Sequence, residues 1–330
     1  RRSTMRPGRV SAASNPAPPP ELVTRFKAAL ERLNPAGGKI GLAVSGGPDS
    51  MAMLLLAHAA IPGGFAVATV NHGLRAEAAD ECALVVAVCK ERKIPCTVLD
   101  VTVATGNVQA LARDARYAAL GEWADRSGLS SVATAHHVDD QAETLMMRLN
   151  RGSGVAGLAG VRERRELAGS AACLIRPLLG FRRSELATVV AAEGVEVARD
   201  PSNLDIRFDR VRMRAQLEQA DWLDPVALAQ SASNLADGFA ALQDYARLLW
   251  GQQVRQHGDG YTLTPIPSRE MNRRLLAEIL ERFGARPRGG DVARLLAMLE
   301  RGQGGNVGGV LATVEGDHWL FRPEPPRRSG

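Results

Sequence analysis

Short apolar runs alternate with longer amphipathic segments along the first part of the chain. The apolar runs have the length and β-branched content of buried strands, and lie at residues 40–44, 65–70, 95–101, 129–135 and 176–179. The segments between them have the apolar spacing of helices, and lie at residues 21–33, 51–59, 76–93, 107–117 and 182–193. This alternation predicts parallel βαβ units, and therefore an α/β fold.

The pattern changes after residue 216. Helical spacing then predominates, followed by a hairpin pattern, at residues 225–249, 270–283, 291–300, 310–314 and 318–321. We therefore expect two domains, 21–216 and 217–330, the second smaller and mainly helical with a terminal hairpin. Residues 1–20 are rich in Arg, Ser, Ala and Pro and contain no acidic residue. They are predicted to be a disordered tail, with an organellar transit peptide or a start-site artefact as alternatives.

Composition narrows the class of protein. The 330 residues are 45% hydrophobic, carry a net charge of +5 and have a pI of 9.3, which suits a globular protein of about two domains. No run reaches the roughly 18 apolar residues of a membrane span, so a cytoplasmic protein is expected. Only four of the 41 basic residues are lysines. Arginine suits phosphate and bases, which favours a nucleic-acid partner, although codon bias would give the same composition.

The four cysteines show no metal-ligand spacing and are expected to be reduced. Cys82 and Cys89 lie on one face of a predicted helix, so core packing is their expected role.

A glycine-containing loop follows the first predicted strand. Its sequence is SGGPDS, formed by Ser45, Gly46, Gly47, Pro48, Asp49 and Ser50. The glycines let the backbone turn and approach a ligand, and the following helix directs its positive end to the same point. This predicts a phosphate site, with serine hydroxyls on phosphate oxygens and Asp49 on Mg²⁺. The loop lacks the Walker A lysine and the dinucleotide glycine spacing. The alternative is a β-turn in which Asp49 or Ser50 caps the helix.

Other candidates follow further along the chain. His72 ends a strand in the segment NHGLR, where it is predicted either to contact adenine or to finish a turn. Arg113, Arg116 and Tyr117 lie within about one turn of a helix, and Arg151 lies in the glycine-dense segment RLNRGSGVAGLAG. These arginines are candidates for phosphate or RNA contacts, with solvated surface charge as the alternative.

The densest polar cluster is HHVDDQAET, which follows the strand predicted at 129–135. Asp139, Asp140 and Glu143 open a helix, and Asp139 and Glu143 share one face of it. That face is expected to point to the same sheet edge as SGGPDS. Helix capping explains one acid well but this density poorly. The cluster therefore predicts a metal or catalytic site.

SGGPDS resembles the PP-loop of the ATP pyrophosphatase superfamily, which implies a Rossmann-like parallel sheet that binds ATP. Residues 40–214 further resemble the tRNA(Ile)-lysidine synthetase family through SGGPDS, NHGLR, ARDARY, ATAHHVDDQAET, RGSGVAGLAG, RPLL and DPSN in this order. The resemblance implies a ligase that uses ATP to adenylate the C2 oxygen of the wobble cytidine in a tRNA(Ile) with a CAU anticodon. The ε-amine of free L-lysine then displaces AMP, which gives lysidine.

The resemblance also assigns roles. Ser45 to Ser50 and His72 would bind ATP, and Asp49 with Asp139 would hold Mg²⁺, which offsets charge on the departing pyrophosphate. Asp140 or Glu143 would deprotonate or orient the lysine amine. The three arginines named above, at positions 113, 116 and 151, are candidates for polyphosphate or anticodon contacts. Val211 stands where relatives often have asparagine, so the RNA contact of residues 209–214 is left open, as is homodimer formation.

Three other functions are weighed against this one. A PP-loop tRNA thiolase would adenylate a base in the same way, but normally needs catalytic cysteines, often as CxxC, and this chain has no CxxC. A metal-dependent phosphohydrolase built on His136, His137, Asp139 and Asp140 would leave SGGPDS unexplained. A catalytically idle RNA-binding module would not need Asp49, Asp139 and Glu143.

Overall fold

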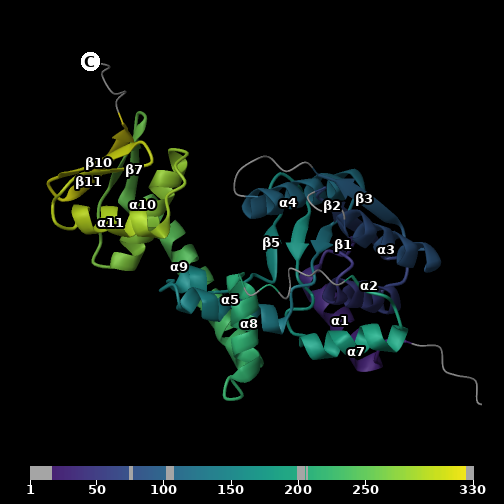
Figure 1. Ribbon diagram of the computed structural model, residues 1–330. Coiled ribbons are helices and arrows are strands. Elements are labelled where there is room, and N and C mark those ends of the chain that lie inside the picture. The colour runs from purple at the N-terminus through teal and green to yellow at the C-terminus, as the bar shows by residue number, and fades with distance from the viewer. Residues whose placement is uncertain (1–16, 74–76, 102–107, 199–204, 206, 325–330) are drawn as a thin grey trace, which may run out of the picture. The chain divides into compact units, whose positions relative to one another are not determined.

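The computed structural model describes residues 17–73, 77–101, 108–198, 205 and 207–324, and the chain divides into two compact units, Arg1–Asn234 and Leu235–Gly330 (Figure 1). Most of the expected tail, Leu74 and Arg75 of NHGLR, and all of DPSN lie outside the described residues. The unit boundary falls inside a long helix. The domain boundary expected at 216/217 stays a prediction.

Six described strands of the first unit form one sheet in the order β3-β2-β1-β4-β6-β5. Every neighbouring pair is parallel except β5 with β6, which is antiparallel. The α/β fold with a Rossmann-like parallel sheet is therefore confirmed. The strands are β1 (Ile40–Ala43), β2 (Phe65–Asn71), β3 (Cys96–Asp100), β4 (Ser131–Ala133), β5 (Arg164–Glu166) and β6 (Cys173–Ile175).

Two sequence predictions near the sheet need correction. Residues 176–179 form a turn, and the strand lies just before them at Cys173–Ile175. β5 was not predicted, because three exposed polar residues on an edge strand carry no apolar signal.

Helices cover both faces of this sheet. On one face, α1, α2, part of α3 and α7 enclose a core that includes Phe26, Leu42, Leu55 and Phe65. On the other face, Trp123 of α4 packs so closely that a side chain at Gly41 would lie 2.5 Å from its ring. The first-unit helices are α1 (Pro20–Leu33), α2 (Pro48–Ala60), α3 (Glu77–Glu91), α4 (Val108–Arg126), α5 (Val138–Leu149), α6 (Val155–Leu158), α7 (Arg183–Glu193) and α8 (Asp209–Gln219).

Neighbouring β1 and β4 mark the point where the strand order reverses. β1 leads into SGGPDS and α2, and β4 leads into HHVDD and α5. In open parallel sheets a crevice forms outside the carboxyl ends of such a strand pair, and ligands bind there. The topology therefore brings the two main sequence motifs to one crevice.

The second unit has more sheet than expected. Its described strands form an antiparallel sheet in the order β7-β8-β11-β10-β9, of which only the β10–β11 hairpin was predicted. Trp319 is 5% exposed and packs within the core of this unit. The elements are α9 (Pro225–Gln253, shared with the first unit), β7 (Val254–His257), β8 (Gly260–Leu263), α10 (Arg269–Arg282), α11 (Gly289–Leu299), β9 (Gly305–Val307), β10 (Val310–Glu315) and β11 (His318–Pro323).

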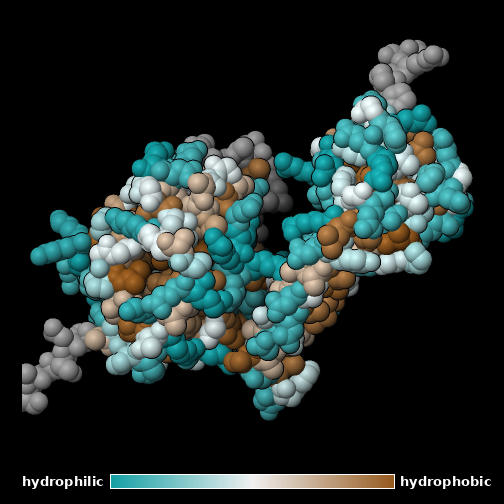
Figure 2. All heavy atoms as spheres, turned by 180° about the vertical axis from the view of Figure 1, so that it is seen from behind, coloured by the Kyte–Doolittle hydropathy of each residue, from teal (hydrophilic) through white to brown (hydrophobic). Residues whose placement is uncertain are grey.

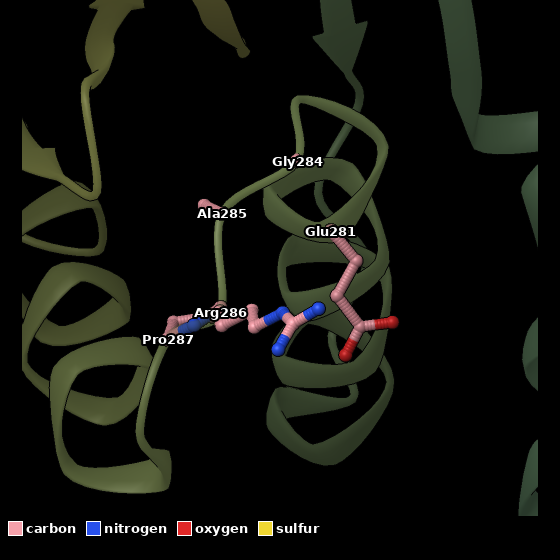
Figure 3. A pocket seen from close by; sticks show the side chains of 5 residues that line it. All are labelled: Glu281, Gly284, Ala285, Arg286 and Pro287. Atoms are coloured by element: carbon pink, nitrogen blue, oxygen red, sulfur yellow. The ribbon is translucent and has the colours of Figure 1, made fainter. Parts of the chain in front are cut away.

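The face of each unit that Figure 2 shows is mostly hydrophilic, with smaller hydrophobic areas. Within the described residues, no helix has the length and apolar character needed to cross a bilayer. A hollow of about 540 Å³ lies at the turn between α10 and α11, where Glu281 and Arg286 extend beside it (Figure 3). None of its lining residues belongs to the motifs that the sequence singled out.

Candidate active site

The SGGPDS loop turns sharply between β1 and α2. Gly46 has φ +84°, in the left-handed region that favours glycine, and an added Cβ would lie 3.2 Å from the Glu81 carbonyl oxygen. Gly47 has an ordinary φ of −69°, and its nearest neighbour would be the Ser45 hydroxyl at 3.7 Å. The fold therefore requires glycine at position 46. At position 47, glycine leaves open space at the start of α2.

The two serines of the loop differ in their surroundings. Ser50 is 6% exposed, and its hydroxyl donates to the Gly47 carbonyl at 2.9 Å and accepts the Ser45 N–H at 3.1 Å. Ser45 is exposed, with its hydroxyl 3.2 Å from that of Ser50. Ser50 therefore holds the shape of the loop, while Ser45 faces solvent. Pro48 occupies the first position of α2, where its missing N–H costs no hydrogen bond.

His137 is fully buried and joins the two motifs. Its Nε2 lies 3.4 Å from Asp49 and 3.5 Å from Asp140, and its Nδ1 lies 3.5 Å from Asp139. Burial alone would lower the pKa of His137, but Asp139, Asp49 and Asp140 together raise it to about 9. The Asp140 amide also lies 3.4 Å from Nδ1, a contact that only the neutral ring can accept. The three carboxylates therefore favour the charged ring, whereas the Asp140 amide contact favours the neutral one.

Asp139 and Asp140 are held as carboxylates. Burial would raise the pKa of Asp139, but His137, the Arg183 N–H at 2.8 Å and the Arg182 guanidinium at 3.3 Å lower it strongly. Burial would also raise the pKa of Asp140, but the charges of His137 and Arg210 lower it. Asp140 accepts the His137 N–H at 3.1 Å and pairs with Arg210 at 2.9 Å.

Glu143 is 1% exposed and is surrounded by arginines. Arg210 and Arg214 of α8 each donate from Nε at 2.8 Å, and Arg183 of α7 lies at 3.4 Å. A single carboxylate of α5 thus holds two neighbouring helices. Its oxygens are already filled by protein donors.

Sequence reasoning missed several of these partners. His137 was named only as a ligand of the rejected phosphohydrolase, and Arg182 and Arg183 were not singled out. Residues 206–214 are dense in arginine, but nothing in a linear pattern shows that two of these arginines fold back onto the acidic face of α5. The one signal available for these contacts was that a buried acid requires a partner of opposite charge.

The remaining candidates lie at different places. Arg151 pairs with Asp209 at 2.8 Å and is 61% exposed. Arg113 and Arg116 project from α4, and the Arg113 guanidinium lies 5.4 Å from the centre of the Tyr117 ring. His72 directly follows β2 and precedes Gly73, whose φ is +61°. Within the described part of the chain, the three arginines form no ion pair with Asp49, Asp139, Asp140 or Glu143.

The glycine-dense segment after α5 is folded onto that helix. Arg148 donates to the carbonyl groups of Gly157 and Gly160. Gln141 exchanges two hydrogen bonds with the Val161 backbone, at 2.7 and 2.8 Å. Gly160 has φ +65°, and an added Cβ would lie 2.6 Å from the Gln141 side chain. This segment is therefore fixed by α5 and includes the short helix α6.

Comparison with known proteins agrees with this arrangement. Residues 20–221 match the family model described as PP-loop domain. The tRNA(Ile)-lysidine synthase of Novosphingobium aromaticivorans is 45% identical over 313 residues, which cover 93% of this chain and 95% of that protein. The enzyme of the same name from Zymomonas mobilis is 36% identical, over 89% of this chain and 91% of that protein.

Among solved structures, the U34-tRNA thiolase NcsA of Methanococcus maripaludis, described with its [4Fe-4S] cluster, has a TM-score of 0.52. It is 18% identical and covers 68% of this chain and 80% of its own length, so the likeness concerns the fold alone. The sequence relatives cover nearly the whole chain at much higher identity. From the PP-loop match and these relatives, the chain belongs to the tRNA(Ile)-lysidine synthase family of PP-loop proteins.

Proposed function

We propose that this protein is an ATP-dependent ligase that converts the wobble cytidine of tRNA(Ile) with a CAU anticodon into lysidine. The cytidine C2 oxygen attacks the α-phosphorus of ATP, and pyrophosphate leaves. The ε-amine of free L-lysine then attacks C2, the C2–oxygen bond breaks, and AMP leaves as the amine loses its protons. A tRNA substrate makes the cytoplasm the proposed location.

One observation carries the proposal. The phosphate loop after β1 and the carboxylates after β4 meet through His137, whose ring lies within 3.5 Å of Asp49, Asp139 and Asp140. A polyphosphate site and an acidic site thus share one crevice, as a reaction that uses both ATP and the amine of lysine requires.

The loop supplies the phosphate site. The first-turn N–H groups of α2 have no acceptor within the helix, and the helix dipole adds positive potential at the same point. The open space at Gly47 lets phosphate oxygens approach the backbone. Charge that develops on pyrophosphate as it leaves is therefore stabilised by groups already in place.

The carboxylates supply the amine site. Asp140 and Asp139 are held ionised, which makes them weak bases but good partners for an ammonium group. Of the two residues expected to act on lysine, Asp140 has side-chain exposure of 15% and Glu143 of 2%. We assign Asp140 to holding and orienting the lysine amine. Glu143 is assigned to positioning, because three arginines already occupy its oxygens.

Mg²⁺ is part of the proposal, with Asp49 and Asp139 as the carboxylates expected to hold it. Mg²⁺ takes one or two carboxylates together with substrate phosphates. Asp49 fits, since among the described residues its carboxylate meets one charged side chain, His137, and it stands at the phosphate loop. Asp139 fits less well, because its oxygens already meet the Arg183 N–H, Arg182 and His137. Bound there, Mg²⁺ would offset the charge of the polyphosphate.

Alanine at Asp139 tests the two roles of that residue. If Asp139 holds Mg²⁺, Asp139→Ala should raise the Mg²⁺ concentration needed for half-maximal turnover. If it only holds the start of α7, this concentration should stay unchanged while stability falls. Asp49→Ala is the matched variant. If the dependence of turnover on Mg²⁺ concentration is unchanged in both variants, the assignment of Mg²⁺ to these carboxylates is wrong.

The function itself is tested by transfer of radiolabelled lysine to a tRNA(Ile) transcript with a CAU anticodon, with and without ATP. The methionine tRNA with the same anticodon serves as control. We expect ATP-dependent labelling of the isoleucine tRNA alone. Release of AMP and pyrophosphate without labelling would keep the adenylation step but point to another nucleophile, such as sulfide. Absence of any tRNA-dependent ATP consumption would support an idle RNA-binding module.

A further inference from the structure

A second arginine cluster lies on the first unit, apart from the one around Glu143. Its centre is Tyr117 of α4, with the Arg113 guanidinium 5.4 Å and the Arg165 guanidinium 4.6 Å from the ring centre. Arg113 and Arg165 are exposed, and Tyr117 is half-buried. Arg165 belongs to β5, the edge strand of the sheet. Two cationic groups therefore lie around one aromatic ring at the protein surface.

A buried arginine lies behind this ring. Arg176 is 2% exposed and donates to the Arg162 carbonyl, and Tyr117 is among the groups that act on its pKa. Its Nε is buried without a hydrogen-bond partner among the described residues. Burial lowers the pKa of Arg176, and the charges of Arg165 and Arg113 act in the same direction. A buried guanidinium thus lies behind the ring, and the described residues do not use all of its hydrogen-bond donors.

No described carboxylate forms an ion pair with Arg113, Arg165 or Arg176. Arginines elsewhere in the unit do have such partners, for example Arg92 with Glu193 at 2.8 Å. Charges on an edge strand protect against strand pairing, which would account for Arg165. That explanation does not account for the buried Arg176 or for Arg113 on a helix. Uncompensated positive charge of this density is typical of an anion site.

The register of β5 places the cluster beside the crevice. β5 runs antiparallel to β6, with Arg164 opposite Ile175 at the carboxyl end of β6. That end faces the same way as the carboxyl ends of β1 and β4, and Figure 1 shows β5 at the margin of this sheet. The charges of Arg176 and Arg113 also act on His136, which precedes the acidic cluster.

We infer that Arg113 and Arg165, which lie around Tyr117 in front of the buried Arg176, form a contact site for the RNA backbone next to the cytidine that reacts. This inference rests on the proposed function and extends its tRNA site. Exposed guanidinium groups bind phosphates, and their planes stack on unpaired bases. The occupant is RNA rather than the ATP polyphosphate, because the polyphosphate has its own site at SGGPDS and because Arg165 stands exposed on the sheet edge.

The test compares Arg165→Ala with Arg126→Ala. Arg126 also has an exposed guanidinium in this unit, and it pairs loosely with Glu122 at 3.7 Å. Affinity for a CAU anticodon stem-loop is measured by fluorescence anisotropy at several salt concentrations. Loss of one single-strand phosphate contact should weaken binding about fourfold at 0.15 M salt and reduce the salt slope by about 0.7. Arg126→Ala should match the wild type in both quantities.

Affinity for ATP without RNA separates the two phosphate sources. We expect Arg165→Ala to leave it unchanged, and a loss of ATP affinity with unchanged RNA binding would assign the cluster to the polyphosphate instead. Equal RNA affinity and salt slope in the two variants would overturn the inference. The binding assay needs no turnover, so its outcome is independent of the lysine-transfer assay. Wild type that binds the stem-loop but transfers no lysine would refute the proposed function and not this site.

Discussion

Replacement of Glu143 by glutamine separates a chemical role from a structural one. The side chain is 1% exposed and links α5 to α7 and α8 through Arg183, Arg210 and Arg214. Glutamine keeps the size of the side chain but removes the charge and turns one acceptor into a donor. We therefore expect Glu143→Gln to loosen α8 from α5 and to reduce activity only as a consequence.

The magnitude follows from the contacts. Removing one partner of a buried ion pair costs about 3–5 kcal/mol. The arginines here are partly exposed, with side-chain exposures of 27% for Arg214, 31% for Arg183 and 42% for Arg210. They can regain water when the carboxylate is lost, which reduces the cost. We expect the free energy of unfolding to fall by about 2–4 kcal/mol.

Urea unfolding gives the stability change, and lysine transfer at low temperature gives the activity of the folded fraction. Glu122→Gln is the control, because Glu122 forms an exposed ion pair 3.7 Å from Arg126 and its loss should cost less than about 1 kcal/mol. Wild-type stability of Glu143→Gln together with a hundredfold or greater loss of lysine transfer would refute the positioning role. With that result, Glu143 would be assigned to the lysine amine instead.

Three further results are expected. Gly46→Ala should destabilise the protein by about 1–2 kcal/mol because of its positive φ. Gly47→Ala should unfold like wild type in urea but lose ATP affinity in calorimetry. Equal changes in stability and in ATP affinity in the two variants would contradict the open space at Gly47. Burial lowers the pKa of His136 to about 4, below its unfolded value of about 6.5. The unfolded chain therefore binds the extra proton first, and stability should fall by up to about 3 kcal/mol as pH drops from 6.5 to 4; an equal fall in His136→Gln would exclude this cause. Trp319→Ala should cost the second unit about 3–5 kcal/mol, and hydrogen exchange should show faster exchange there, with protection of the first unit retained.

Several features could be predicted from sequence because they depend on neighbouring residues. The strand–loop–helix at residues 40–60 follows from an apolar run, a glycine pair and uninterrupted helical residues. Its helix begins at Pro48 rather than Met51, because proline fits the first helical position. The parallel order also follows from the alternation of strands and helices. β7, β8 and β9 were missed because they are short, and the β7 and β8 sequences VRQH and GYTL have little apolar alternation.

The motifs SGGPDS and HHVDDQAET can therefore be recognised in the sequence, but only the tertiary structure brings them close together. Asp49 and His137 are far apart in the chain and come within 3.4 Å only because β1 and β4 are neighbours in the sheet. Likewise, the sequence shows that Glu143 is acidic and that residues 206–214 are rich in arginine. Only packing of α8 against α5 shows that these charges satisfy one another. Hydrophobic periodicity is local and can be read along the chain, whereas the pairing of buried charges depends on which elements meet in space.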